Sequence, residues 1–217
     1  MQPLRRYGGD ELWSYEAGAR WQSPRLGLTA RLAAFQADCN DIQADLLLPS
    51  GLPFTADLGV GRSRGIEAEA KWSRGGLELG GNLTAQEPEL RRPAPGLPAR
   101  ADSGLPGVPR VSFVAFAAYA QDLDADWRFS TRASYAYVGA SRLVFDAVTA
   151  PRMGGYGDLR LSLTLTSPAM SVGLFAENLL DRRGDTLAYG NPFLLRRQVL
   201  STPQRPRTVG LAVGRNF

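Results

Sequence analysis

Apolar residues occupy alternate positions in the last segment of the chain. Val209, Leu211, Val213 and Phe217 are separated by residues that are mostly small or polar. Because the side chains of a β-strand point alternately to its two faces, this period of two predicts a strand with one apolar face. The same alternation recurs upstream. Together with one segment that is apolar on both faces, residues 108–120, it predicts nine strands in all, at about residues 11–21, 26–35, 57–72, 77–84, 108–120, 127–137, 156–166, 170–176 and 209–217.

The connections between these segments are alternately short and long. Short turns fall near residues 23, 74, 123 and 168. Long loops fall near residues 40–54, 87–107, 139–153 and 181–204. We expect the proline-rich stretch 87–107 to be irregular, because proline is excluded from central strands. Short turns on one side and long loops on the other are typical of outer-membrane barrels. The pattern therefore predicts an all-β fold, an antiparallel transmembrane β-barrel segment.

Aromatic residues near the predicted strand ends agree with this interpretation. Trp13, Trp21, Trp72 and Trp127 stand where a membrane barrel places its aromatic girdles. The alternative is a soluble β-sandwich of the carbohydrate-binding kind, in which the same aromatics would belong to an ordinary core.

Composition excludes several other classes. No apolar run reaches the roughly 18–20 residues that a membrane helix needs. The net charge is +4, but the arginines are scattered without a basic stripe, so we expect no nucleic-acid partner. The chain has one cysteine, Cys39, and no histidine. This removes an internal disulfide, Ser–His–Asp catalysis, the usual zinc sites and histidine-ligated haem. We predict no enzyme activity, no metal site and no cofactor.

Five segments resemble motifs of the TonB-dependent receptors of the Gram-negative outer membrane, in the order that the family has them. They are Glu11–Arg20, Ser63–Glu69, Leu105–Arg110, Ala176–Arg182, and Arg205–Val209 with the terminal Phe217. The resemblance covers nearly the whole chain and corresponds to the C-terminal part of the receptor barrel. It implies a barrel of about twenty-two strands, closed by a separate plug domain and energised by TonB. It also implies that the terminal strand, with Phe217 at its end, carries the signal for insertion by the barrel assembly machinery.

The resemblance divides the chain into an N-terminal extension or outer loop, residues 1–10, and a barrel portion, residues 11–217, without a plug or a TonB box. A nine-stranded open sheet would expose two unpaired edges to lipid, at a cost of several kcal/mol for each unpaired backbone group. We therefore expect the chain to be a fragment of a larger receptor. A smaller self-contained outer-membrane barrel is the alternative.

Charged residues fall on the positions opposite the apolar ones, so alternation predicts that they face the lumen. The set comprises Glu16, Arg20, Arg31, Glu67, Glu69, Lys71, Arg128, Arg132, Asp158, Arg160 and Glu177. Such charges would hydrate the interior and pack against the plug, or some of them would guide an anionic substrate. Asn178 and Asp181 stand where a strand meets a long loop, and we expect them to hydrogen-bond to the backbone and end that strand.

The long loops supply the candidate ligand-binding residues. Aromatic rings and guanidinium groups suit a flat, anionic iron chelate through stacking and charge-assisted hydrogen bonds. The candidates are Arg91, Arg92, Arg142, Phe145, Tyr189, Phe193, Arg196, Arg197 and Gln198. The resemblance implies active uptake of a ferric siderophore or a similar scarce nutrient in the outer membrane. The implied partners are outer-membrane lipid, the plug, the TonB complex and a small ligand. Several ligand classes share this barrel pattern, so the sequence does not identify the ligand.

Overall fold

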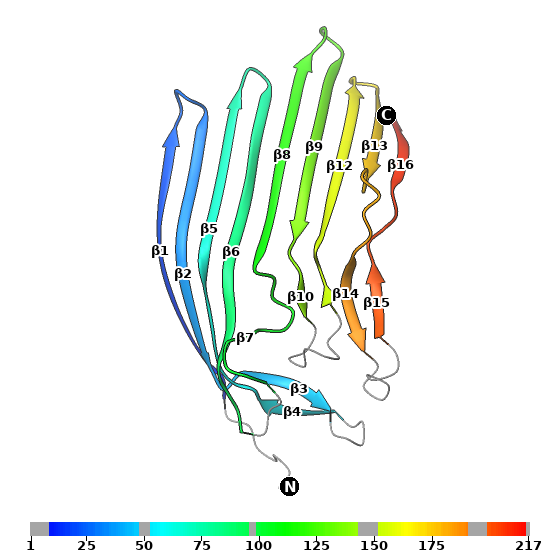
Figure 1. Cartoon of the computed structure of the whole chain (residues 1–217). Helices are drawn as coiled ribbons and strands as arrows, with labels where there is room; N and C mark the ends of the chain where they lie inside the picture. The colour runs from blue at the N-terminus through cyan, green and yellow to red at the C-terminus, as the bar shows by residue number, and fades with distance from the viewer. Residues whose placement is uncertain (1–8, 48–52, 96–98, 143–151, 191–198, 216–217) are drawn as a thin grey trace.

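A computed structural model describes residues 9–47, 53–95, 99–142, 152–190 and 199–215 of the chain. Its main feature is one antiparallel sheet with nine long strands in the order β1-β2-β5-β6-β8-β9-β12-β13-β16 (Figure 1). Each strand pairs with the next long strand along the chain, as in a meander. The strands are β1 (Glu11–Ser23), β2 (Leu28–Asn40), β5 (Gly59–Arg74), β6 (Leu77–Pro93), β8 (Val111–Asp122), β9 (Arg128–Val138), β12 (Tyr156–Thr166), β13 (Met170–Glu177) and β16 (Thr208–Arg215). The nine predicted strands are confirmed.

The short turns all lie at one end of the sheet, which we call the short-turn end. The long connections gather at the other, the long-connection end (Figure 1). There the chain forms three two-stranded hairpins and one added strand, in stretches for which the sequence predicts loops. The hairpins are β3 (Gln43–Leu47) with β4 (Pro53–Asp57), β10 (Ser141–Arg142) with β11 (Arg152–Met153), and β14 (Asp185–Gly190) with β15 (Val199–Pro203); β7 (Ser103–Gly104) adds to β6.

The expectation of irregular structure from residue 87 onward is wrong for its first part. Strand β6 continues to Pro93 and pairs with β5 along its whole length. Its other edge pairs with β8 only as far as Ala85, and Pro88 lies beyond that point. A proline costs little where no neighbouring strand needs its N–H group. The Pro88 carbonyl still accepts a hydrogen bond from the Leu105 amide, at 3.1 Å.

The register assigns one face of the sheet to apolar residues. One cross-strand row runs through Ala17, Ala34, Ile66, Ala85 and Val111, and the next row toward the short-turn end, Ala19, Leu32, Ala68, Leu83 and Phe113, is also apolar. These side chains are not covered by a second layer. Among the described residues the buried apolar side chains are few: Ala33, Leu58, Pro88, Leu90 and Ala176.

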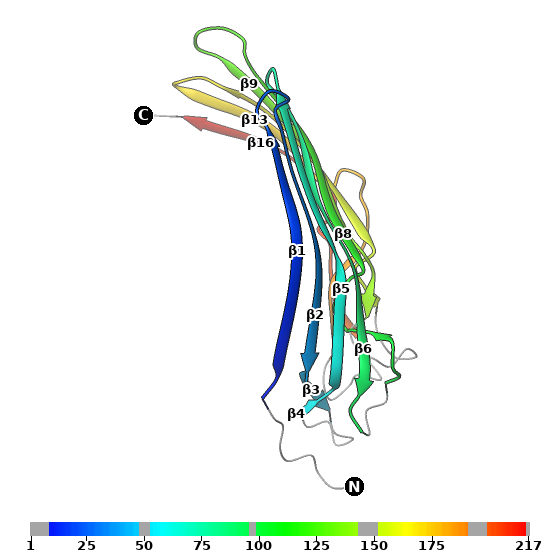
Figure 2. The ribbon, with the colours of Figure 1, turned by 90° about the vertical axis from the view of Figure 1, so that its left-hand side faces the viewer.

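A sheet with this much exposed apolar surface requires apolar surroundings, because burial of such surface is the main force that stabilises folded chains. The two-sheet sandwich considered from the sequence is therefore wrong. Figure 2 shows a single curved sheet seen from its β1 edge. Within the described residues β1 and β16 form its two edges and do not pair with each other, so the barrel is open.

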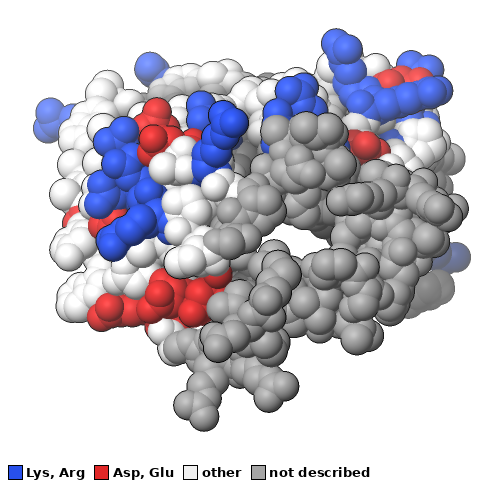
Figure 3. All heavy atoms as spheres, turned by 60° about the horizontal axis from the view of Figure 1, so that its bottom comes forward, with Lys and Arg blue, Asp and Glu red and all other residues white. Residues whose placement is uncertain are grey.

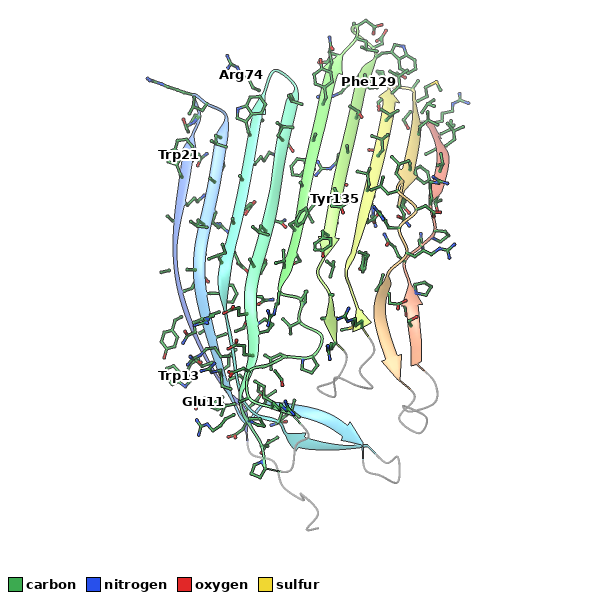
Figure 4. The ribbon with its side chains drawn as sticks, viewed as in Figure 1. Glu11, Trp13, Trp21, Arg74, Phe129 and Tyr135 are labelled. Atoms are coloured by element: carbon green, nitrogen blue, oxygen red, sulfur yellow. The ribbon has the colours of Figure 1, made fainter. Side chains whose placement is uncertain are left out.

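Aromatic side chains mark the limits of the apolar face. Trp13 and Trp21 lie near opposite ends of β1 (Figure 4) and are 54% and 50% exposed. The eight residues from one to the other span about 27 Å at the usual rise of a strand. At the 35–45° tilt of strands in membrane barrels, this length covers about 19–22 Å of thickness, close to the roughly 25 Å apolar band that aromatic girdles flank on both sides.

Candidate functional site: the polar face of the sheet

The second face of the sheet, which we call the polar face, carries the predicted lumen charges. The register places Glu67, Glu69 and Lys71 of β5 there, across from Thr84, Asn82 and Gly80 of β6. The same face continues to β9 and β12. There it carries the other charges named for the lumen in the sequence, Arg132, Asp158 and Arg160, with Ser162 opposite Arg132 and Ser134 opposite Arg160.

Part of the polar face is neutralised by ion pairs between neighbouring side chains. Lys71 Nζ lies 2.6 Å from Glu78 Oε2 on the adjacent strand. Arg160 Nε donates a hydrogen bond of 2.7 Å to Asp158 Oδ2 on its own strand. At the short-turn end, Arg128 Nη1 lies 2.9 Å from Asp122 Oδ1. These charges balance one another and need no further partner.

Another part of the polar face is not neutralised. Arg20 and Arg31 are direct cross-strand partners, and Arg31 also lies opposite Glu69. Within the described part of the chain neither arginine forms an ion pair, nor do Glu67 and Glu69. Like charges directly opposite each other destabilise a sheet unless something of opposite charge lies between them. This region of the polar face is thus well suited to a charged partner.

Asn178 and Asp181 form the predicted backbone hydrogen bonds at the end of β13. The Asn178 side chain is 2% exposed, and its Nδ2 donates to the carbonyls of Arg182 and Arg205 at 2.9 and 2.8 Å. Its Oδ1 accepts from the Arg182 amide at 2.9 Å, and Asp181 Oδ1 accepts from the Arg207 amide at 3.2 Å. Both residues have positive φ, which Asn and Asp tolerate better than most residues. They fix the long connection to the strand end.

The candidate ligand-binding residues in the long connections are only partly within the described structure. Arg91 Nη1 contacts Glu89 at 3.1 Å and Asp102 at 2.8 Å, so its charge is already balanced. Arg92 is exposed opposite Val60. The backbone of Arg142 pairs with that of Arg152 in the β10–β11 hairpin, and the backbone of Tyr189 pairs with that of Leu200 in the β14–β15 hairpin. The remaining candidates, Phe145, Phe193, Arg196, Arg197 and Gln198, lie outside the described residues, as does Phe217.

The structure nevertheless brings three of the long connections together. The Gly107 amide donates to the Arg142 carbonyl at 2.8 Å, which joins the connection before β8 to the one after β9. The Gly154 amide donates to the Asp185 carbonyl at 2.9 Å, which joins the latter to the connection after β13. Hydrogen bonds therefore join described segments of three long connections that are far apart in the sequence.

A charged group at this end, on the side of the apolar face, was missed by the sequence analysis. Arg62 Nε donates to Asp38 Oδ1 at 2.6 Å, and Arg64 Nη2 lies 2.8 Å from Glu87 Oε2. Figure 3 shows Lys and Arg gathered beside Asp and Glu at this end of the molecule. The sequence does contain a sign of this group. Arg62 and Arg64 occupy the same alternate positions as the apolar Ile66, so two charged residues interrupt the apolar side of β5.

Comparison with known proteins identifies the family. The family model "TonB dependent receptor-like, beta-barrel" matches residues 10–179. The fold is similar to the ferric yersiniabactin uptake receptor FyuA from Yersinia pestis, with a TM-score of 0.75 and 23% identity over 94% of this chain and 29% of that one. It is also similar to the ferric-catecholate import receptor Fiu from E. coli K12, with a TM-score of 0.68 and 19% identity over 95% of this chain and 27% of that one. The copper transporter OprC has a TM-score of 0.68 and 14% identity over 99% of this chain and 32% of its own.

The chain thus spans less than a third of each of these three structures. Identities this low show a shared fold and nothing about the ligand. No curated protein sequence matches the chain at a significant level. The described residues contain no helix with the length and hydropathy to cross a membrane. Because the family model matches well over half of the residues, the chain belongs to the TonB-dependent receptor β-barrel family.

Proposed function

We propose that this chain forms part of the wall of an outer-membrane receptor that takes up a ferric siderophore or a similarly scarce nutrient, energised by TonB. The observation that carries the proposal is the two-faced, nine-stranded sheet, with exposed apolar residues on one side and charged residues on the other, in a chain of this family. Receptors of the family reside in the Gram-negative outer membrane. The apolar face would contact lipid, and the polar face would line the interior.

The partners follow from the same assignment. The uncompensated region around Arg20, Arg31, Glu67 and Glu69 would contact a charged surface inside the barrel, such as the plug domain. The plug and the TonB complex would supply energy coupling. The barrel assembly machinery would recognise the last strand, with Phe217 at its end. The short-turn end would face the periplasm, and the long-connection end would face the medium.

Ligand capture would take place at the long-connection end. The candidate residues combine guanidinium groups with aromatic rings, which suit an anionic metal chelate. They are Arg91, Arg92, Arg142, Phe145, Tyr189, Phe193, Arg196, Arg197 and Gln198. The balanced charge of Arg91 makes it the weakest candidate, whereas Arg92 is exposed and forms no ion pair within the described structure. Proteins of similar fold include an uptake receptor for a ferric chelate and the copper transporter OprC. The fold therefore does not determine which ligand is transported.

A transport assay tests the function. Cells lacking the gene, and the same cells with the gene restored on a plasmid, would be grown under iron limitation and supplied with ⁵⁵Fe on a panel of chelates, with ⁶⁴Cu as a second cargo. We expect uptake of at least one chelate to require the gene and to stop when tonB is deleted. Uptake of every chelate and of copper at the same rate with and without the gene would overturn the proposal.

A further inference from the structure

Arg132 stands apart from the other charges of the polar face because an aromatic ring supports it. Its guanidinium carbon lies 3.9 Å from the centroid of the Phe116 ring on the adjacent strand β8. The Phe116 ring in turn lies over Gly80 of β6, where an added Cβ would come within 2.7 Å of the ring. Glycine at position 80 therefore leaves the room that the ring occupies, and the ring holds the guanidinium in one place.

The charge of Arg132 has no counterion in the described part of the chain. Glu78, in the same cross-strand row as Arg132, is already engaged by Lys71 at 2.6 Å, and Asp158 on the neighbouring strand β12 by Arg160 at 2.7 Å. Apart from the Phe116 ring and the paired Glu78, the side chains around Arg132 mostly carry hydroxyls or are small. Ser162 and Ala118 are its direct cross-strand partners, and Ser130 precedes it by two positions on the same face.

A cavity of about 270 Å³ opens beside this arginine. Arg132, Ser130, Ser162, Ala118 and Gly76 are among the residues that line it, and so is Glu78, whose carboxylate is paired with Lys71. Small side chains provide the space, two serines provide hydroxyl donors, and the stacked guanidinium keeps its N–H edge free for an oxygen acceptor. A volume of this size accommodates a carboxylate, a phosphate or one chelating arm of a larger ligand.

We propose that Arg132, with Ser130 and Ser162, forms an anion-binding site near the short-turn end of the barrel interior. The site binds an anionic oxygen group of the transported chelate after it has left the long connections. This inference rests on the proposed function. It adds a second binding site for the transported ligand near the periplasmic exit. This site lies at the opposite end of the sheet from the candidate residues of the long connections, such as Arg92 and Arg142.

A direct binding measurement tests the site independently of transport. The complete receptor, purified in detergent, would be dialysed against ³²P-labelled inorganic phosphate as the probe. We expect one weak phosphate site whose affinity falls at least about fivefold in Arg132→Gln and partly recovers in Arg132→Lys. Arg128→Gln is the matched control, because Arg128 lies on the same strand and face but is neutralised by Asp122. We expect this control to bind phosphate as the unaltered receptor does.

Phe116→Leu gives a second variant that keeps the charge and removes the aromatic support. We expect it to weaken phosphate binding less than Arg132→Gln does. All variants would first be checked for normal amounts in the outer membrane and for normal heat-modifiable migration. Absence of a phosphate site, or equal affinity in Arg132→Gln and the unaltered receptor, would overturn the proposal. So would an equal loss of binding in Arg128→Gln.

A transport assay distinguishes two possible partners of Arg132, the transported ligand and a carboxylate of the plug. In energised cells we expect Arg132→Gln to slow uptake of an anionic chelate about tenfold, with unchanged binding at the cell surface, and to leave a neutral chelate almost unaffected. An equal loss for both chelates would mean that Arg132 contacts a carboxylate of the plug, and the anion site would be rejected. If no chelate were transported even by the unaltered receptor while phosphate binding still depended on Arg132, the proposed function would fail and the site would stand.

Discussion

Leu32 and Arg31 are neighbours in β2, and they belong to opposite faces of the sheet. Leu32 is 55% exposed and lies across from Ala19 and Ala68. Arg31 lies across from Arg20 and Glu69. A shift of one residue in register would exchange the two environments. The two faces therefore differ in what they tolerate. The apolar face accepts little charge, whereas the polar face carries many charges, some of which have no partner.

The largest expected effect comes from placing a charge on the apolar face. Leu32→Arg puts a guanidinium inside the apolar band, opposite Ala19, at a cost of up to about 2–4 kcal/mol, the figure for the midplane of a membrane barrel. Because Leu32 is exposed, little packing is lost with it. We expect the free energy of unfolding, measured by urea titration of the complete receptor in phospholipid vesicles, to fall by that amount.

The matched control places the same residue on the polar face. Thr84→Arg lies opposite Glu67, which has no ion pair in the described part of the chain. We expect it to change the free energy of unfolding by less than about 1 kcal/mol. Equal destabilisation by the two substitutions would show that the two faces have been assigned wrongly.

A smaller effect is expected where a polar side chain is buried at the strand end. Asn178→Ala removes three hydrogen bonds from a side chain that is 2% exposed, and leaves two carbonyls and one amide without that partner. Loss of buried hydrogen bonds of this kind costs about 1–3 kcal/mol. The same urea titration measures it, with Asn82→Ala as the control on the exposed polar face. A neutral Asn178→Ala would contradict its structural role.

Sequence alternation predicted the faces well, because side-chain direction in a strand depends only on local geometry. Strand β12 has the bounds that its four alternating leucines predict, Tyr156–Thr166. Asn178 and Asp181 were also predicted correctly, because their side chains act on backbone groups close by in the chain or at the same strand end.

Lateral neighbours could not be predicted in this way. The stacking of Arg132 on Phe116 over Gly80 depends on the register between three strands, and alternation within one strand carries no information about register. The extension of β6 through Pro88 depends on where β8 stops pairing, which is also a relation between strands. The hairpins in the long connections have short strands whose alternation is too brief to recognise.

The smallest expected effect concerns a charge pair on the polar face itself. The Lys71 and Glu78 side chains are 53% and 30% exposed, with Nζ and Oε2 2.6 Å apart. Water screens a pair this exposed, so a double-mutant cycle of Lys71→Gln and Glu78→Gln should give a coupling energy below about 1 kcal/mol in the urea titration. A coupling above about 2 kcal/mol would require that water is excluded from this region, as it is around buried ion pairs. In that case the polar face would be covered by another part of the receptor at Lys71, and the difference between the two faces would be one of charge and not of exposure to water.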